Sequence, residues 1–135
     1  MIAVLGMWEL GWNTPIMEFD LWNFPLREFN VDEFCMTPIT GIAKKVKEFA
    51  SIEEGIVNFS NLVPVVFDER GETNLRDFEH PEDVLYIFGK ANYSPLINLE
   101  IEKSVFIKTP QNKGMMWPHQ VATLVLYDRW AKQWQ

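Results

Sequence analysis

The last third of the chain constrains the fold most, because it combines two buried-strand segments with an unusually apolar helix. The segments 84–88 and 104–107 are short apolar runs, and the first of them stops at Gly89. Between Val121 and Tyr127 almost every residue is apolar, whereas a helix on a protein surface needs only one apolar stripe. We therefore expect this terminal helix to be enclosed by protein.

Further apolar segments recur along the chain and alternate with helical patterns. We predict as strands the segments 2–5, 32–36 and 62–67, with a minor strand at 46–49. We predict as helices the segments 16–29, kinked at Pro25, 52–59, after a capping box that begins at Ser51, and 95–103. This alternation predicts one α/β domain, residues 1–135, with a mostly parallel sheet of about five or six strands flanked by helices.

Composition narrows the class of protein. The chain is 47% hydrophobic and 14% aromatic, which is typical of an ordered globular protein. Its formal net charge of -7 argues against extended nucleic-acid binding, because phosphates repel an acidic surface. The single cysteine, Cys35, cannot form an internal disulfide and fits a reducing cytoplasm. Because no run of about 18 apolar residues and no leader pattern is found, we expect a cytoplasmic protein without a membrane partner.

Four short motifs follow one another in a distinctive order. They are Phe29-Asn30-Val31-Asp32-Glu33, His80-Pro81-Glu82 with the strand that ends in Phe88-Gly89, Ile107-Lys108-Thr109-Pro110, and Val121-Ala122 with Val125-Leu126-Tyr127-Asp128. Their order and spacing resemble the SPOUT-family RNA methyltransferases of the SpoU and TrmH kind, over residues 62–130 in detail and over the first sixty in outline. The resemblance implies a trefoil knot at residues 84–127, with the terminal helix threaded through an earlier loop and S-adenosylmethionine bound against the knotted backbone.

The catalytic positions of the resembled family carry different residues in this chain. An ungapped comparison places Glu18 where the family has Asn, Phe24 where it has the catalytic Arg, and Ala91 where it has Glu. Residues 116–118, Met-Trp-Pro, replace the family's Ser-Leu-Asn. Methylation of a 2′-hydroxyl group requires a side chain that orients or deprotonates it. The candidates for relocated catalytic groups are Arg27, Glu18 and Asn13.

The resemblance places the cofactor at loops that meet on one edge of the sheet, where ligands bind in open α/β folds. The cofactor-binding candidates are Phe88, Gly89, Lys90, Ile107, Thr109, Gly114, Met115, Met116 and Trp117. Residues 115–117 have an alternative interpretation as a cap on the core. Lys90, Lys108 and Lys113 would add positive charge at this edge. No pattern of His, Cys and acidic residues indicates a metal site.

Other polar residues have plainer interpretations. We interpret His80, before Pro81, as a turn residue and His119, at a helix start, as a solvated or capping residue. As an alternative to a catalytic role, Glu18 and Arg27 would belong to a surface ion-pair set on the kinked helix.

The sequence leaves two functions open, and it also predicts how the chain assembles. The first is an S-adenosylmethionine-dependent RNA methyltransferase with altered catalytic residues. The second is a non-catalytic knotted module for binding or assembly. The resembled family pairs through the terminal helix and the helix after the first strand, and both are aromatic here, so we expect a homodimer. The aromatic residues concerned are Phe19, Trp22, Phe29, Tyr127, Trp130 and Trp134.

Overall fold

The structure, a computed structural model, describes residues 1–9, 11, 13–41, 44–90, 94–97, 99–112 and 116–134. Within these residues the strands form one seven-stranded sheet in the order β3-β2-β1-β6-β4-β7-β5, and each pairing is parallel. The strands are β1 (Ile2–Met7), β2 (Glu33–Thr37), β3 (Lys47–Glu48), β4 (Val63–Phe67), β5 (Thr73–Asn74), β6 (Val84–Phe88) and β7 (Lys103–Phe106). The helices are α1 (Pro15–Glu28), α2 (Ile52–Asn58) and α3 (Pro118–Gln133), with short 3-10 turns η1 (Leu75–Asp77) and η2 (Pro95–Ile97).

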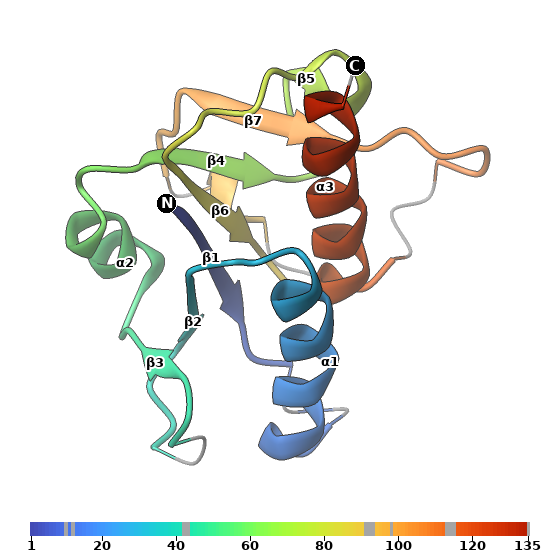
Figure 1. Ribbon diagram of the computed structural model, residues 1–135. Helices are drawn as coiled ribbons and strands as arrows, with labels where there is room; N and C mark the ends of the chain where they lie inside the picture. The colour runs from blue at the N-terminus through green and yellow to red at the C-terminus, as the bar shows by residue number, and fades with distance from the viewer. Residues whose placement is uncertain are drawn as a thin grey trace.

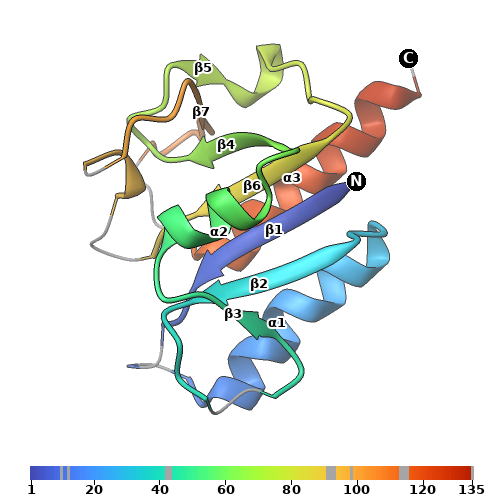
Figure 2. The same cartoon turned by 90° about the vertical axis from the view of Figure 1, so that its left-hand side faces the viewer.

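Helices cover both faces of the sheet. α1 and α3 pack side by side on one face, and α2 lies on the other (Figure 1, Figure 2). Successive residues of a strand point to opposite faces, so Val4 and Tyr86 join the core beneath α1 and α3. Leu5 and Ile87 join the core beneath α2. This arrangement confirms the α/β fold with a parallel sheet and explains why the central strands β1 and β6 are almost uniformly apolar.

Local sequence signals account for the starts of the first two helices. Thr14 Oγ1 accepts the Met17 N–H at 3.3 Å before α1. Ser51 Oγ accepts the Glu54 N–H at 3.2 Å, and Glu54 reaches back to the Ala50 N–H at 3.1 Å. The capping signal at Ser51 is therefore confirmed, and α1 continues through Pro25 to its last turn.

The sheet and one helix differ from the sequence-based expectations. The sheet has seven strands rather than five or six, because the two-residue strand β5, which was not predicted, pairs with β7 at one edge, whereas β3 confirms the minor strand expected at 46–49. The helix expected over residues 95–103 is wrong, since the described residues of this segment form the 3-10 turn η2 and β7 already begins at Lys103. Such short elements offer too few residues for a periodic pattern to develop.

α3 is not enclosed by protein, which corrects the expectation for the terminal helix. One side is buried against the sheet through Ala122, Val125, Leu126 and Arg129. The other side carries large apolar residues that are 42–75% exposed: Leu124, Tyr127, Trp130 and Trp134. The helix looks apolar all round because two of its faces are apolar. One face packs against the core, and the other lies exposed on the surface of the chain.

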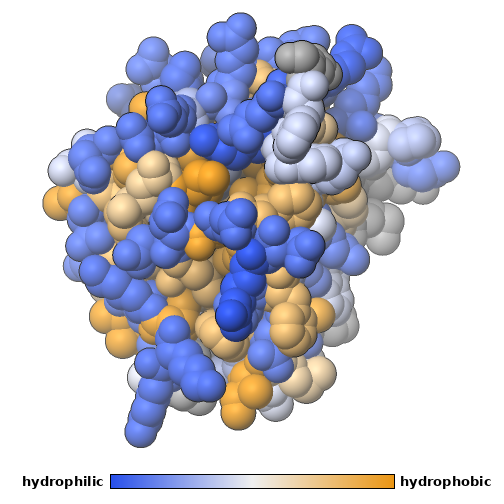
Figure 3. Space-filling view, viewed as in Figure 1, coloured by the Kyte–Doolittle hydropathy of each residue, from blue (hydrophilic) through white to orange (hydrophobic). Residues whose placement is uncertain are grey.

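α1 also has a buried face and an apolar exposed face. Glu18, Trp22 and Leu26 are buried. The exposed apolar residues of the helix are Ile16, Met17, Leu21 and Phe24. Apolar and polar side chains alternate over the face shown in Figure 3, with apolar ones across its middle and lower parts, and Figure 1 places α1 in the lower part of this view.

Among the described residues, none of the helices has the length and apolar character needed to cross a bilayer.

Candidate functional site

A small pocket lies at the carboxyl edge of the sheet, where α1 and α3 both begin. It is lined by Glu9, Asn13, Glu18, Trp22, Trp117, Pro118 and His119. Glu9 follows β1, Asn13 precedes the first turn of α1, and Trp117 immediately precedes α3. Three segments of the chain therefore meet at the edge where open parallel sheets bind their ligands.

Glu18 contributes a buried carboxylate to this pocket. Its side chain is 1% exposed, and its two oxygens accept the Glu9 N–H at 2.9 and 2.8 Å. Burial raises the pKa of Glu18, whereas the Glu9 N–H and the positive charge of Lys90 act in the opposite direction. The carboxylate thus joins the end of β1 to α1 and also brings negative charge to the pocket.

His119 lies between two tryptophan rings in the same pocket. Its imidazole meets Trp22 and Trp117 edge to face, with ring centroids 6.2 and 5.4 Å apart. Burial lowers the pKa of His119. Its Nε2 atom is buried and has no hydrogen-bond partner among the described residues. The interpretation of His119 as a solvated or capping residue is therefore wrong for this nitrogen.

The indole nitrogen of Trp22 is a second buried polar atom beside this pocket. Its side chain is 1% exposed, and no described acceptor stands in hydrogen-bonding geometry with Nε1. The indole nevertheless lies close enough to Glu18 to favour the ionised carboxylate. Because buried polar groups are normally satisfied, the unpartnered His119 Nε2 atom beside this pocket indicates a place that a ligand or water completes.

The three catalytic candidates from the sequence are not all brought together. Asn13 and Glu18 line the pocket. Arg27 is exposed in the last turn of α1, nine residues beyond Glu18, which corresponds to about 13 Å along a helix axis. Glu18 is buried rather than part of a surface ion-pair set.

The cofactor candidates occupy several positions along this edge. Gly89 and Lys90 follow β6, and Ile107 and Thr109 follow β7. Phe88 is 2% exposed and stacks on Phe67 with a centroid distance of 5.0 Å. Its side chain therefore belongs to the core rather than to an open surface.

The remaining cofactor candidates lie before α3. Trp117 is 45% exposed and lines the pocket, and Met116 beside it is half-buried. Gly114 and Met115, like Lys113 and Ala91, lie outside the described residues. The part of this loop that the structure describes is thus continuous with the pocket.

Two pocket residues were missed as functional candidates by sequence reasoning. His119 was assigned to solvent, and Trp22 was assigned only to the core and a dimer surface. Neither lies in a motif that marks a site, and their relation depends on the side-by-side packing of α1 and α3. The aromatic Trp117 two residues before His119 was the only local signal.

A second polar cluster lies on the opposite edge of the sheet, where β6 begins. His80 Nδ1 is 2.7 Å from Tyr86 Oη, and His80 Nε2 is 2.7 Å from Asp128 Oδ2. Arg129 donates to the Pro81 carbonyl oxygen at 2.7 Å and to Tyr86 Oη at 3.0 Å. His80, expected to be only a turn residue, is instead a buried link between the loop before β6 and α3.

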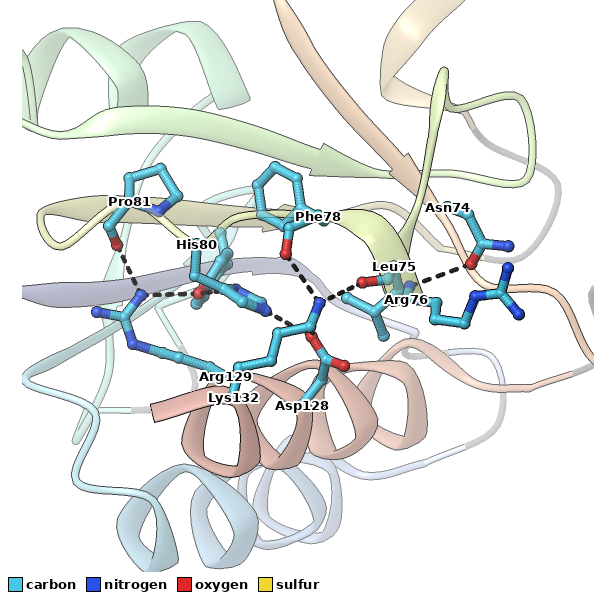
Figure 4. Close-up of polar contacts among 10 residues, drawn as sticks. Asn74, Leu75, Arg76, Phe78, His80, Pro81, Asp128, Arg129 and Lys132 are labelled. Carbon is cyan, nitrogen blue, oxygen red and sulfur yellow. Dashed lines mark hydrogen bonds and ion pairs between the residues drawn. The ribbon is translucent and has the colours of Figure 1, made fainter. Parts of the chain in front are cut away.

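Lys132 completes this cluster. Its Nζ donates to the carbonyl oxygens of Leu75 and Phe78 at 2.6 and 2.8 Å and pairs with Asp128 at 2.8 Å. Figure 4 shows the side chains of α3 reaching toward the segment that contains η1 and His80. The cluster consists of internal contacts that fasten the last turns of α3, so we assign it a structural role.

The fold is that of the SpoU and TrmH RNA methyltransferases. The SpoU methyltransferase AviRb from Streptomyces viridochromogenes, solved with the cofactor S-adenosylmethionine, superposes with a TM-score of 0.78 over 98% of this chain at 14% identity. A putative RNA methyltransferase from Bacillus anthracis superposes with a TM-score of 0.74 over 98% of this chain and 94% of its own length, also at 14% identity. A structure that concerns the 2-OH methylation of C/U34 on tRNA superposes with a TM-score of 0.77 over 99% of this chain and 92% of its own length, at 9% identity.

These structural likenesses hold without detectable similarity in sequence. No protein-family model and no curated protein matches the chain. The chain spans 60% of the length of the Streptomyces enzyme. The comparisons therefore establish the fold, and the activity of this chain is a separate question.

Proposed function

We propose that this chain binds S-adenosylmethionine at the carboxyl edge of its sheet and transfers the methyl group to a ribose hydroxyl of RNA. The observation that carries the proposal is the pocket at this edge, in a fold shared with an enzyme that was solved with that cofactor. The pocket combines a buried carboxylate, an imidazole and two tryptophans within one small volume. Such convergence of a few polar groups on an apolar hollow is typical of a small-molecule site.

The residues at this edge fit such a cofactor. Gly89 follows the fully buried strand β6 and offers close approach to the backbone. Ile107, which follows β7, packs against the core and offers an apolar wall. The Glu18 carboxylate and the Trp117 ring suit the positive charge of a sulfonium group. When bound, the cofactor would supply an activated methyl group, and the chain would supply orientation and exclusion of water.

Calorimetric titration with S-adenosylmethionine and S-adenosylhomocysteine tests the proposal. We expect saturable binding of both ligands with one site per chain. Gly89→Leu should weaken binding at least about tenfold, because a bulky side chain would block close approach to the backbone, and each tenfold corresponds to about 1.4 kcal/mol. Val57→Leu, on the exposed side of α2, is the matched control and should bind as the parent does. Absence of binding at millimolar ligand would contradict the proposal.

A non-catalytic binding module is the second candidate function, and one observation favours it. Phe24, which stands where the resembled family has its catalytic Arg, is 69% exposed on α1. A phenyl ring cannot orient or deprotonate a hydroxyl group. Binding of S-adenosylhomocysteine without methyl transfer to any short RNA would support this alternative over the enzyme.

We also propose the trefoil knot at residues 84–127 and a homodimer. The knot is supported by the shared fold and by α3 beginning at the edge where β6 and β7 end. The homodimer is supported by the apolar side chains that α1 and α3 expose next to one another. A contiguous apolar surface of this kind usually marks an interface. RNA as the substrate is likewise a proposal, and the net charge of -7 favours a short contact over an extended one.

A further inference from the structure

We propose that His119 accepts the proton from the hydroxyl group that this site methylates. The inference rests on the methyl transfer proposed above and assigns the acid–base role that the missing family residues leave vacant. His119 lines the pocket together with Glu18 and Asn13.

The geometry holds the imidazole in place and leaves one nitrogen available. The edge-to-face contacts with Trp22 on α1 and with Trp117 restrict rotation of the ring. Nε2 is buried and has no hydrogen-bond partner among the described residues. A buried polar atom without a hydrogen-bond partner destabilises the free protein. A ligand hydroxyl that donates to Nε2 would remove this destabilisation.

The charge state of the ring suits a proton acceptor. Because burial lowers the pKa of His119, the imidazole is neutral near pH 7. With its proton on Nδ1, the lone pair of Nε2 is free to accept a hydrogen bond. The charged groups that line the pocket are Glu9, from the connection after β1, and Glu18 of α1.

The other candidates serve this role less well. Both oxygens of Glu18 already accept the Glu9 N–H. Arg27 lies at the far end of α1, and a guanidinium group does not accept protons. Asn13 has an amide side chain, which is not a base. His119 is therefore the pocket residue best able to take the proton.

The methyl transfer breaks two bonds and forms two. The O–H bond of the ribose hydroxyl breaks, and its proton moves to His119 Nε2. The oxygen forms the new bond to the methyl carbon, and the electron pair of the carbon–sulfur bond stays on sulfur, leaving S-adenosylhomocysteine. His119 then releases the proton to solvent.

Imidazole NMR provides a test that does not depend on activity, because the chain has only two histidines. His119→Gln identifies the His119 resonances by their loss, and His119→Asn serves as a second variant if the first does not fold. The parent protein, saturated with S-adenosylhomocysteine, is titrated with cytidine 5′-monophosphate and with its 2′-deoxy counterpart. We expect the ribonucleotide to shift the His119 Nε2 resonance and the deoxynucleotide to leave it nearly unchanged.

The outcomes separate this inference from the proposed function. If S-adenosylhomocysteine binds but no ribose-dependent shift occurs, the role of His119 is wrong and the cofactor site stands. If S-adenosylhomocysteine does not bind, the proposed function itself fails. The rate of methyl transfer by His119→Gln to a short RNA should fall about 100-fold or more, and an unchanged rate would overturn the inference.

Discussion

Glu18 shows how a single residue can serve the fold and the pocket together. A carboxylate in the first turn of a helix is favoured by the helix dipole, and this one also secures the chain after β1 by accepting the Glu9 N–H. Its burial nevertheless works against the negative charge, as the raised pKa indicates. A buried charge that does not maximise stability is typical of a functional position.

Glu18→Gln should therefore change the pH dependence of stability. An acid whose pKa is raised in the folded state contributes stability below its unfolded pKa of about 4.5, and this contribution is lost as the pH rises through the folded pKa. Glutamine has no such dependence, and its carbonyl oxygen still accepts the Glu9 N–H. The variant should gain stability relative to the parent as the pH rises from 4 to 7, measured by urea unfolding. Parallel pH profiles for the two proteins would contradict the assignment.

A second prediction concerns the reactivity of the Cys35 thiol. It is buried in β2, and burial raises the pKa of its thiol to about 11. The thiolate is the reactive form, so the native protein should react with a thiol reagent at neutral pH far more slowly than the urea-unfolded protein does. Equal rates in the two states, followed by absorbance, would place Cys35 outside the core.

The last turns of α3 depend on polar contacts rather than on apolar packing. Arg129 is 8% exposed and donates to the carbonyl oxygens of Pro81 and Glu82 as well as to Tyr86 Oη. Replacing it with methionine keeps the length of the side chain but leaves these three acceptors without their donor. Arg129→Met should lower the free energy of unfolding by about 2–4 kcal/mol.

Arg76 is a matched control for this prediction. Its side chain is 85% exposed, and its contact with Asp77 is a 3.7 Å surface ion pair. Arg76→Met should change the free energy of unfolding by no more than about 0.5 kcal/mol. If both variants unfold at the same urea concentration as the parent, the cluster on α3 does not fasten the helix.

His80 makes the same cluster sensitive to pH. The neutral imidazole of His80 accepts a hydrogen bond from Tyr86 Oη and donates one to Asp128. Tyr86 Oη in turn accepts a hydrogen bond from Arg129. A second ring proton on His80 would remove the acceptor of the Tyr86 hydroxyl and break this hydrogen-bond network. Burial lowers the pKa of His80, against the opposing effect of Asp128, while Lys132 and Arg129 lower it further. The contribution of His80 to the free energy of unfolding is therefore fully present above pH 6.5, and it is lost as the pH falls through the pKa of His80 in the folded state. The stability difference between the parent and His80→Gln should shrink from pH 8 to pH 5, and a constant difference would contradict this account.

The whole molecule carries an apolar surface made by two helices. Trp130 lies on the exposed side of α3 and is 47% exposed. Light scattering at micromolar concentration should give about twice the chain mass of 15.8 kDa. Trp130→Glu should give a monomer, because a charge would be buried at the proposed interface. Val57→Glu, on the other face of the sheet, is the control and should remain dimeric, whereas a monomeric parent protein would refute the dimer.

The strands and the class of fold were predictable from the sequence, because apolar runs such as Val84 to Phe88 are confined to buried parallel strands. The exposure of one side of α3 was not predictable from the sequence, because Leu124 and Tyr127 are residue types common in protein cores but lie on the surface of this chain. The periodicity of apolar residues predicts which faces of a helix are apolar, but it does not predict whether protein or solvent covers those faces.

The candidate site was only partly predictable, for a related reason. Asn13, Glu18 and Trp117 were named from the motifs, and they line one pocket. His119 was not, because its contact with Trp22 joins residues about a hundred positions apart and depends on how α1 and α3 pack. The polar link between His80 and Asp128 spans the sequence in the same way.

A crystal structure with S-adenosylhomocysteine tests the central claim most directly. We predict the ligand at the carboxyl edge of the sheet, in contact with Gly89, with residues 107–109 and with Trp117, and with His119 Nε2 facing the place of the transferred methyl group. The same structure would trace the chain through residues 113–115 and decide whether α3 is threaded. Ligand bound at the opposite edge near His80, or a carboxyl edge that stays empty at saturating ligand, would contradict the account.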